Sequence, residues 1–212
     1  MAAEKSERCV IICASPEADV EFLARFVRGD DFIVCADGGL SYVLAAGAEP
    51  DLIVGDFDSY DGVLPESVET VTLNRRKDFS DTHIAADIAL ERGYRDIVLM
   101  FATGGRLDHT LSNICVLKYL SGRGASACAV SARERVYYCS DSLEIGGCEG
   151  KTFSLIAYNC DNCTATCAGD IEYPVSDTVF SSGVSLGLSN VSRGDRLSLR
   201  VSDGEMLLII ND

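Results

Sequence analysis

The sequence predicts an α/β N-terminal domain with a mostly parallel, doubly wound sheet, followed by an all-β C-terminal domain of sandwich-like architecture. Up to about Ala125, short apolar runs alternate with segments of helical periodicity, as expected for strands connected by helices. Beyond Ala125, short strand-like runs follow one another, separated by turn signals such as Asp141-Ser142 and Asp203-Gly204. We therefore place one domain at residues 1–135 and the other at residues 136–212.

The individual elements follow from hydrophobic periodicity and from the glycine and proline residues between them. In the N-terminal part we expect strands at residues 9–14, 32–36, 52–54, 68–73 and 97–101. Helical patterns cover residues 18–28 and 41–48, and two more begin after Asp81 and after His109. In the β-rich part we expect strands at residues 127–131, 136–139, 152–158, 163–168, 196–201 and 206–210.

Composition excludes several classes of protein. The chain has 212 residues, of which 47% are hydrophobic and 24% charged, which is an ordinary globular balance. Its formal net charge of −15 argues against broad contact with the phosphate backbone of a nucleic acid. We find no apolar run of about 18 residues, so we expect no membrane span. Residues 1–8 are charged where a signal peptide would be apolar, so we expect a cytoplasmic protein.

The ten cysteines are expected to be reduced thiols, because disulfides are rare in the cytosol. Cys160, Cys163 and Cys167 form a C-x2-C-x3-C pattern, which raises the possibility of a metal site. A fourth ligand at matching spacing is missing, and the segment alternates like a strand. We therefore favour buried or edge thiols.

Residues 51–59 are the first candidate for a functional site. Three apolar residues lead into Gly55 and then into Asp56 and Asp58, which resembles a buried strand delivering its carboxyl end to a site. If the strand persists, the two carboxylates point to the same side and repel each other unless a cation neutralises them. Such a pair suits Mg²⁺ bound to a nucleotide. An acidic turn is the alternative.

Glycines follow two other predicted strands. Gly38 and Gly39 follow Asp37 at the end of one strand, where they permit either close approach to a ligand or a plain strand-to-helix turn. Gly104 and Gly105 precede a helix, so free N–H groups can form an anion site there. Arg106 adds a planar fork that matches phosphate oxygens.

Two acidic clusters lie at predicted helix starts. Asp78, Ser80 or Asp81 could cap the first of these helices, but capping accounts for one residue and not for Lys77 together with two aspartates. Asp108 could likewise be the N-cap of the following helix. The position of His109 is compatible with a base, a phosphate contact or a packed ring.

Taken together, these segments resemble the thiamine pyrophosphokinase family. The matching motifs, in order and approximate spacing, are Asp37-Gly38-Gly39, Gly55-Asp56-Phe57-Asp58-Ser59, Lys77-Asp78-Phe79-Ser80-Asp81 and Gly104-Gly105-Arg106-Leu107-Asp108-His109. Residues 183–190 resemble the thiamine-side segment of the family, and residues 169–174 resemble another stretch of its β domain. The chain departs from the family at Ser80, where threonine is usual, and at Val191, where bacterial members often carry an acidic residue. Its glycine-rich stretch in the β domain is also shortened.

The resemblance implies transfer of a pyrophosphoryl group from ATP to the hydroxyl of thiamine, with Mg²⁺, giving thiamine diphosphate and AMP. It implies that residues 1–135 form the nucleotide-binding catalytic domain and that residues 136–212 form a β-sandwich thiamine-binding domain. It also implies a homodimer whose interface shapes the thiamine site.

The same resemblance assigns roles to individual residues. The expected catalytic residues are Asp56, Asp58, Asp81, Arg106 and Asp108, and the four aspartates among them are the expected Mg²⁺ ligands. The expected nucleotide contacts are Asp37, Gly38, Gly39, Ser59, Lys77, Asp78, Gly104, Gly105, His109 and Asn113. Thiamine is expected to contact Asp81, Ser189 and Asn190, and Asp81 is a candidate to accept the proton of its hydroxyl.

Two other functions compete with this interpretation. A Mg²⁺-dependent phosphatase of the haloacid dehalogenase type would use the D-x-D pattern of Asp56 and Asp58, but it leaves the segment around Arg106 and the β-rich part unexplained. A non-catalytic nucleotide- or vitamin-sensing module is the other alternative. Retention of so many carboxylates argues against it, because unneutralised acids repel one another. A P-loop kinase is disfavoured, since the chain has no G-x4-G-K-[ST] motif.

Overall fold

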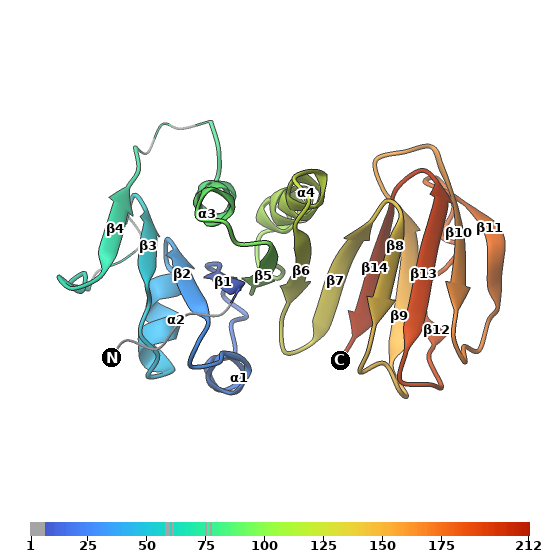
Figure 1. Ribbon diagram of the computed structural model, residues 1–212, viewed down its shortest axis with the longest axis horizontal. Coiled ribbons are helices and arrows are strands. Elements are labelled where there is room, and N and C mark those ends of the chain that lie inside the picture. The colour runs from blue at the N-terminus through green and yellow to red at the C-terminus, as the bar shows by residue number, and fades with distance from the viewer. Residues whose placement is uncertain (1–6, 58–59, 61, 75, 77) are drawn as a thin grey trace. The chain divides into compact units, whose positions relative to one another are not determined.

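The computed structural model of the chain describes residues 7–57, 60, 62–74, 76 and 78–212. The predicted site residues Asp58, Ser59 and Lys77 lie outside the described residues. The chain divides into two compact units, Met1–Ala132 and Arg133–Asp212, and each is described by itself (Figure 1).

Unit 1 is built on a parallel sheet with the strand order β6-β5-β1-β2-β3-β4. Its strands are β1 (Arg8–Ile12), β2 (Phe32–Ala36), β3 (Leu52–Gly55), β4 (Glu69–Thr72), β5 (Asp96–Met100) and β6 (Ser126–Val130). Its helices are α1 (Val20–Phe26), α2 (Gly39–Ala45), α3 (Asp81–Glu91) and α4 (Leu107–Gly122). Helices α1 and α2 cover one face of this sheet, and α3 and α4 cover the other (Figure 1). The predicted mostly parallel α/β sheet is therefore confirmed.

The apolar runs form the central strands because both faces of the sheet are covered. Every residue of β1, β2 and β3 is buried, as expected for parallel strands between two helical layers. On the face of α1 and α2, Ile12 of β1 packs in one cluster with Leu23 of α1 and with Leu40 and Val43 of α2. The edge strand β4 is half-buried and polar by comparison.

The sheet order reverses between β1 and β5. From β1 the chain adds β2, β3 and β4 on one side, and it then returns to place β5 and β6 on the other side of β1. The crevice outside the carboxyl ends of the strands at such a reversal is where open α/β sheets bind ligands. The loops that follow β1, β2 and β5 are therefore the expected location of a site.

The helix starts resolve the capping alternatives. Ser80 is the N-cap of α3, and its Oγ accepts a hydrogen bond from the N–H of His83 at 3.3 Å. The N-cap position of α4 is Arg106, without a side-chain cap. Asp108 lies instead in the first turn of α4, so the N-cap interpretation of Asp108 is wrong. A carboxylate in that turn still interacts favourably with the helix dipole.

Unit 2 contains antiparallel strands in two sets, with the orders β12-β9-β14-β7 and β11-β10-β13-β8. The strands are β7 (Glu134–Cys139), β8 (Ser142–Ile145), β9 (Thr152–Ala157), β10 (Asn162–Ala168), β11 (Val175–Ser181), β12 (Asn190–Val191), β13 (Leu197–Asp203) and β14 (Met206–Asn211). Buried side chains of both sets, such as Phe153 and Leu208 of one and Leu199 of the other, form a single hydrophobic cluster. A separate antiparallel β region is thus confirmed.

Some strands differ from the sequence prediction. Residues 127–131 were expected to open the β-rich part, but β6 pairs in parallel with β5 and belongs to unit 1. Strands β8, β11 and β12 were not predicted. β11 is mostly polar, only Phe180 in it is buried, and it carries Asp177 at a φ of 43°. Pairing with β10 stabilises such a strand, and pairing partners are not visible in local periodicity.

The cysteines of the C-x2-C-x3-C pattern belong to the core and edge of unit 2. Cys163 and Cys167 are buried on the inner face of β10, and Cys160 Sγ donates a hydrogen bond to the carbonyl oxygen of Glu205. All ten cysteines of the chain are free. In the described part of the chain, no three His, Cys, Asp or Glu side chains are grouped so that they could hold a metal ion.

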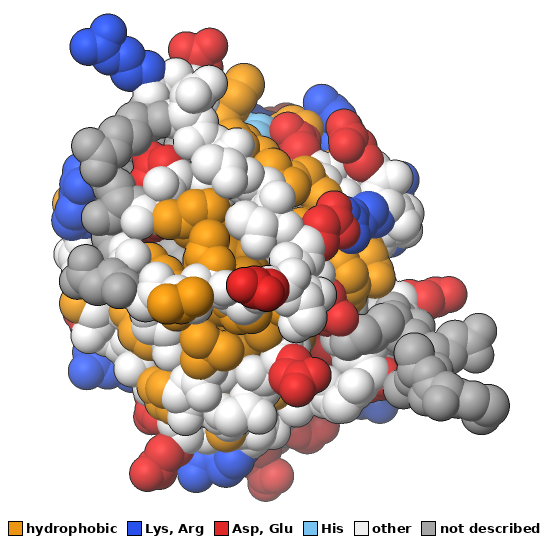
Figure 2. All heavy atoms as spheres, turned by 90° about the vertical axis from the view of Figure 1, so that its left-hand side faces the viewer, with side chains coloured by type: hydrophobic (Ala, Val, Ile, Leu, Met, Phe, Trp, Pro, Cys, Tyr) orange, Lys and Arg blue, Asp and Glu red, His pale blue; other side chains and the backbone are white. Residues whose placement is uncertain are grey.

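The surface of unit 1 reflects the acidic composition. Figure 2 views the side where β4 lies, with hydrophobic side chains gathered near the middle and acidic side chains scattered over the face.

Across the residues that the structure describes, no helix has both the length and the hydropathy that crossing a membrane requires.

Gly39 should be essential to stability because α2 begins directly against β1. A Cβ atom on Gly39 would lie 2.1 Å from the carbonyl oxygen of Ile12, which belongs to the sheet and cannot move aside. We expect Gly39→Ala to lower the free energy of unfolding by about 1–3 kcal/mol or more, measured by urea denaturation. Gly29→Ala is the matched control, since an added Cβ there meets no atom within 4 Å. Equal stability of the two variants would contradict this account.

Candidate active site

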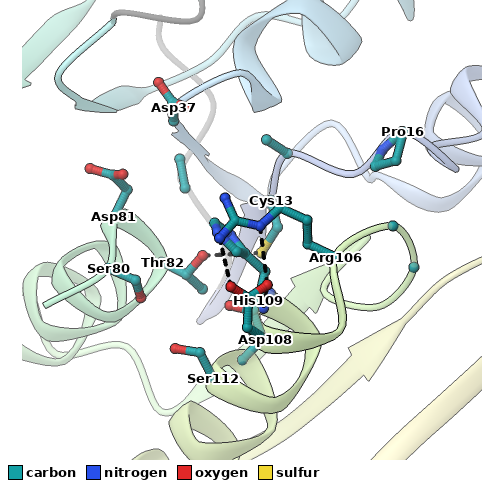
Figure 3. A pocket seen from close by; sticks show the side chains of 15 residues that line it. Cys13, Pro16, Asp37, Ser80, Asp81, Thr82, Arg106, Asp108, His109 and Ser112 are labelled. Atoms are coloured by element: carbon teal, nitrogen blue, oxygen red, sulfur yellow. Dashed lines mark hydrogen bonds and ion pairs between the residues drawn. The ribbon is translucent and has the colours of Figure 1, made fainter.

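A cavity of about 690 Å³ lies at the carboxyl ends of the strands of unit 1. Residues that follow β1, β2 and β5 line it together with the first turns of α3 and α4 (Figure 3). The predicted site residues that it brings together are Asp37, Asp81, Gly104, Gly105, Arg106, Asp108, His109 and Asn113. Residues separated by more than 70 positions in the chain thus share one site.

Two carboxylates reach the cavity from different elements. Asp37 directly follows β2, and its N–H donates to the carbonyl oxygen of Val54 at 2.8 Å, which holds it beside the end of β3. Asp81 is the first residue of α3, immediately after the N-cap. The Oδ1 atom of each carboxylate is buried, and Figure 3 shows the two side chains near the same opening.

Arg106 and Asp108 form an ion pair at the start of α4. Arg106 donates through Nε to Asp108 Oδ1 at 3.1 Å and through Nη2 to Oδ2 at 2.6 Å. This hydrogen bonding lowers the pKa of the Asp108 carboxyl and raises that of the Arg106 guanidinium, so both stay charged. The side chains are 72% and 64% exposed, and a pair that exposed contributes little to stability. Either group can therefore exchange its partner for a charged ligand.

The loop that contains Gly104 and Gly105 packs against the loop after β1. Gly104 and Gly105 have φ angles of 93° and 65°, in the region that favours glycine. A Cβ on Gly105 would lie 2.6 Å from Cδ of Pro16, so the loop after β5 packs tightly on the loop after β1. The N–H of Gly105 donates to Glu17 Oε1 at 3.4 Å. These amide groups are at a helix start, where an anion is favoured.

Cys13, Thr82 and Asn113 form an uncharged part of the cavity wall. Thr82 Oγ1 donates to Cys13 Sγ at 3.6 Å, and burial raises the pKa of the Cys13 thiol to about 12. Cys13 is therefore a neutral thiol and a poor nucleophile at physiological pH. Asn113 is buried, and its Nδ2 donates to the carbonyl oxygen of Ala102 at 2.8 Å, which fixes the end of β5 against α4.

Other predicted residues lie elsewhere. Asp56 follows β3 and is half-buried, while Asp78 is exposed, and neither is among the described residues that line the cavity. Asp56 is nevertheless close in the fold, because a Cβ on the preceding Gly55 would lie 3.1 Å from Cα of Asp37. Gly38 and Gly39 also do not line the cavity. They lie where α2 packs closely on β1 and the loop after it: a Cβ on Gly39 would lie 2.1 Å from the carbonyl oxygen of Ile12, and one on Gly38 would lie 3.3 Å from Cβ of Ala14.

Sequence reasoning missed the contribution of the loop after β1 and of the helix faces. The lining residues not predicted are Cys13, Ala14, Pro16, Ala36, Ser80, Thr82 and Ser112. A signal was present, because the carboxyl ends of neighbouring parallel strands meet at one edge of the sheet.

Of the predicted thiamine contacts, Asp81 lies in unit 1, whereas Ser189 and Asn190 lie in unit 2 and differ in exposure. Asn190 is 5% exposed, and its Nδ2 donates to the carbonyl oxygen of Tyr173 at 2.7 Å. Its Oδ1 accepts from the N–H groups of Tyr173 at 3.0 Å and Val191 at 2.8 Å. Ser189 is exposed at a φ of 56°, and its N–H donates to Ser154 Oγ at 3.1 Å. The Asn190 amide thus binds the backbone of its own unit.

Comparison with known proteins identifies the family. The family model of the thiamin pyrophosphokinase catalytic domain matches residues 23–128, the region that contributes most of the cavity. The chain belongs to the thiamin pyrophosphokinase family. It is 26% identical over 207 residues to the thiamine pyrophosphokinase of Bacillus subtilis (strain 168), covering 94% of this chain and 96% of that protein.

Solved structures share the fold. The crystal structure of thiamine pyrophosphokinase from Bacillus subtilis has a TM-score of 0.83 at 21% identity, covering 96% of this chain and 98% of that chain. The structure of thiamin pyrophosphokinase from Geobacillus thermodenitrificans has a TM-score of 0.82 at 24% identity, covering 97% of both chains. These structures show the shared fold, and the family model confirms the resemblance found in the sequence motifs.

Asn190 should contribute to the stability of unit 2. Asn190→Ala removes hydrogen bonds to both backbone groups of Tyr173, and we expect a loss of about 1–2 kcal/mol in the free energy of unfolding. The exposed neighbour provides the control, because Ser189→Ala should change stability by less than about 0.5 kcal/mol. Chemical denaturation followed by circular dichroism gives both values. An Asn190→Ala variant as stable as Ser189→Ala would show that these bonds contribute nothing.

Proposed function

We propose that the protein transfers the pyrophosphoryl group of ATP to the hydroxyl of thiamine in the presence of Mg²⁺, giving thiamine diphosphate and AMP. Membership of the family implies synthesis of thiamine diphosphate from ATP. The observation that most supports the proposed reaction is the convergence of Asp37, Asp81, Asp108 and Arg106 on one cavity at the reversal of the sheet. In this proposal residues 1–135 bind the nucleotide, and residues 136–212 bind thiamine.

The chemistry of the donor groups fits Mg²⁺. Carboxylate oxygens are hard ligands, and Mg²⁺ usually takes one or two of them together with water and substrate phosphates. Asp56, Asp58, Asp81 and Asp108 are the candidates to hold it, directly or through water. When bound, the ion neutralises negative charge on the phosphate oxygens.

The remaining groups of the cavity have complementary tasks. The Arg106 guanidinium, together with Lys77, would offset the charge of the transferred phosphates and of the leaving AMP. Gly104 and Gly105 allow phosphate to approach the start of α4. Asp81 would accept the proton of the thiamine hydroxyl, since a neutral alcohol is a weak nucleophile. His109, Asn113 and Asp37 would contact the nucleotide.

On the thiamine side, Ser189 and Asn190 would act in different ways. The exposed Ser189 hydroxyl would contact the vitamin. Asn190 was predicted as a second contact, but its amide binds Tyr173 and Val191, so it would act by fixing the backbone that follows Ser189. The net charge of −15 favours the cationic thiazolium ring of thiamine. A homodimer would complete the thiamine site.

The direct test is AMP formation by the purified protein with ATP and Mg²⁺. We expect AMP to appear only when thiamine is added, and the mass of the second product to equal thiamine diphosphate. Chelation of Mg²⁺ should stop the reaction. ADP and inorganic phosphate formed without thiamine would support the phosphatase alternative. Nucleotide binding without turnover would support the sensor alternative.

Replacing Asp81 should separate catalysis from folding. We expect Asp81→Asn to lower kcat by about 100-fold or more, because an amide neither accepts the proton nor provides the charge of the carboxylate. Asp87→Asn is the matched control on the same helix, since Asp87 accepts a hydrogen bond from Tyr119 and does not line the cavity. Circular dichroism should show that both variants are folded. Activity of Asp81→Asn within threefold of the Asp87→Asn variant would exclude the assigned role.

A further inference from the structure

Ser15 joins the two loops that flank the sheet reversal. It follows β1 and is 3% exposed, and its Oγ donates to the carbonyl oxygen of Thr103, in the loop after β5, at 3.0 Å. The same Oγ accepts from the N–H of Glu17 at 3.3 Å. One buried hydroxyl therefore holds the turn after β1 in shape and ties it to the loop that carries the cavity glycines.

The turn that Ser15 organises is the surface against which the glycine loop is packed. A Cβ on Gly104 would lie 3.0 Å from Ser15 Oγ and 3.1 Å from Cδ of Glu17. Two glycines at positive φ allow this loop many backbone conformations when it is unsupported. Its conformation thus depends on the contact with the turn of residues 15–17.

Tyr42 connects α2 to the same two loops. Its hydroxyl donates to the carbonyl oxygen of Ser15 at 2.7 Å. Its ring packs edge-on against Phe101, with ring centroids 6.0 Å apart at an interplanar angle of 86°. Phe101 directly follows β5 at a φ of 57°, and its N–H donates to the carbonyl oxygen of Val130. The Tyr42 side chain thus contacts the loop after β1 and the first residue after β5.

We propose that Ser15 and Tyr42 are positioning residues that clamp three segments together: the loop after β1, the loop after β5 and helix α2. Neither side chain is among the described residues that line the cavity. The clamp fixes Gly104 and Gly105 relative to α2, the helix that follows Asp37. Its kinetic consequence rests on the proposed function, in which these glycines receive phosphate. Its effect on loop motion does not depend on that function.

The first test is amide hydrogen exchange in the ligand-free protein. Ser15→Ala removes the bridge to Thr103, and Tyr42→Phe removes only the hydroxyl and keeps the ring against Phe101. In both variants we expect exchange in residues 101–106 to accelerate by about 10-fold or more, because low-stability segments open locally. Exchange in β2 and β3 should not change. Tyr119→Phe is the matched control, since that hydroxyl donates to Asp87 and not to the two clamped loops or α2.

The second test separates positioning from general destabilisation by steady-state kinetics. We expect each variant to lower kcat/KM for ATP by about 10-fold and to leave KM for thiamine within about twofold, since misplacement by 1 Å can cost 100-fold. The double variant should lose less than the product of the single effects, because both changes act on one clamp.

The outcomes distinguish the clamp from the proposed function. Unchanged exchange in residues 101–106, or equal losses toward both substrates, would overturn the clamp. If Ser15→Ala does not fold, Tyr42→Phe alone decides between these results. If the wild-type protein forms no AMP, the proposed function fails, while the exchange experiment still tests the clamp.

Discussion

Strands β1 and β5 are neighbours in the sheet, although β2, β3 and β4 come between them in the sequence. The chain places these three strands on one side of β1 and then returns to place β5 on its other side. Their carboxyl-end loops are consequently brought together without any intervening strand, and the helices that follow cover opposite faces. The loop after β5 is then confined by the turn of residues 15–17, which leaves room at positions 104 and 105 for glycine alone. The cavity, its glycine loop and the convergence of α3 and α4 all depend on this reversal.

Electrostatics sets the requirements for any ligand of the cavity. Among the described lining residues, three aspartates are accompanied by a single arginine, and that arginine is bonded to Asp108. A polyphosphate entering this environment would meet net negative charge unless a cation accompanied it. The exposed Arg106–Asp108 pair can be divided between a phosphate and a cation at small cost, since exposed ion pairs contribute little to stability. The acidic cavity can therefore accept an anionic substrate when that substrate binds together with a cation.

In unit 2, several residues have contacts that differ from the role their sequence motif suggested. Asn190 belongs to the segment that resembles the thiamine side of the family. Its side-chain amide nevertheless bonds the N–H and the carbonyl oxygen of Tyr173, as a neighbouring strand would, and so links the segments around residues 173 and 190. The exposed Ser189 beside it is held at positive φ by Ser154, through its backbone N–H. In the same unit, the cysteines that suggested a metal site are divided between the core and an edge turn, because β10 buries every second residue.

The sequence by itself determined the features that depend on local pattern. Buried strands appeared as apolar runs, connecting helices appeared as 3.6-residue periodicity, and the acidic motifs at strand ends indicated the family, which the comparisons confirmed. The tertiary structure alone decided which strand ends share a cavity, that Cys13 and Thr82 line it, and that Arg106 is bonded to Asp108. It also decided that Ser80 is a cap, that Asn190 binds backbone, and that the polar strands β8, β11 and β12 exist. The physical reason is that these outcomes depend on partners distant in the chain, through sheet pairing and close packing, whereas periodicity and strand-end motifs are properties of neighbouring residues.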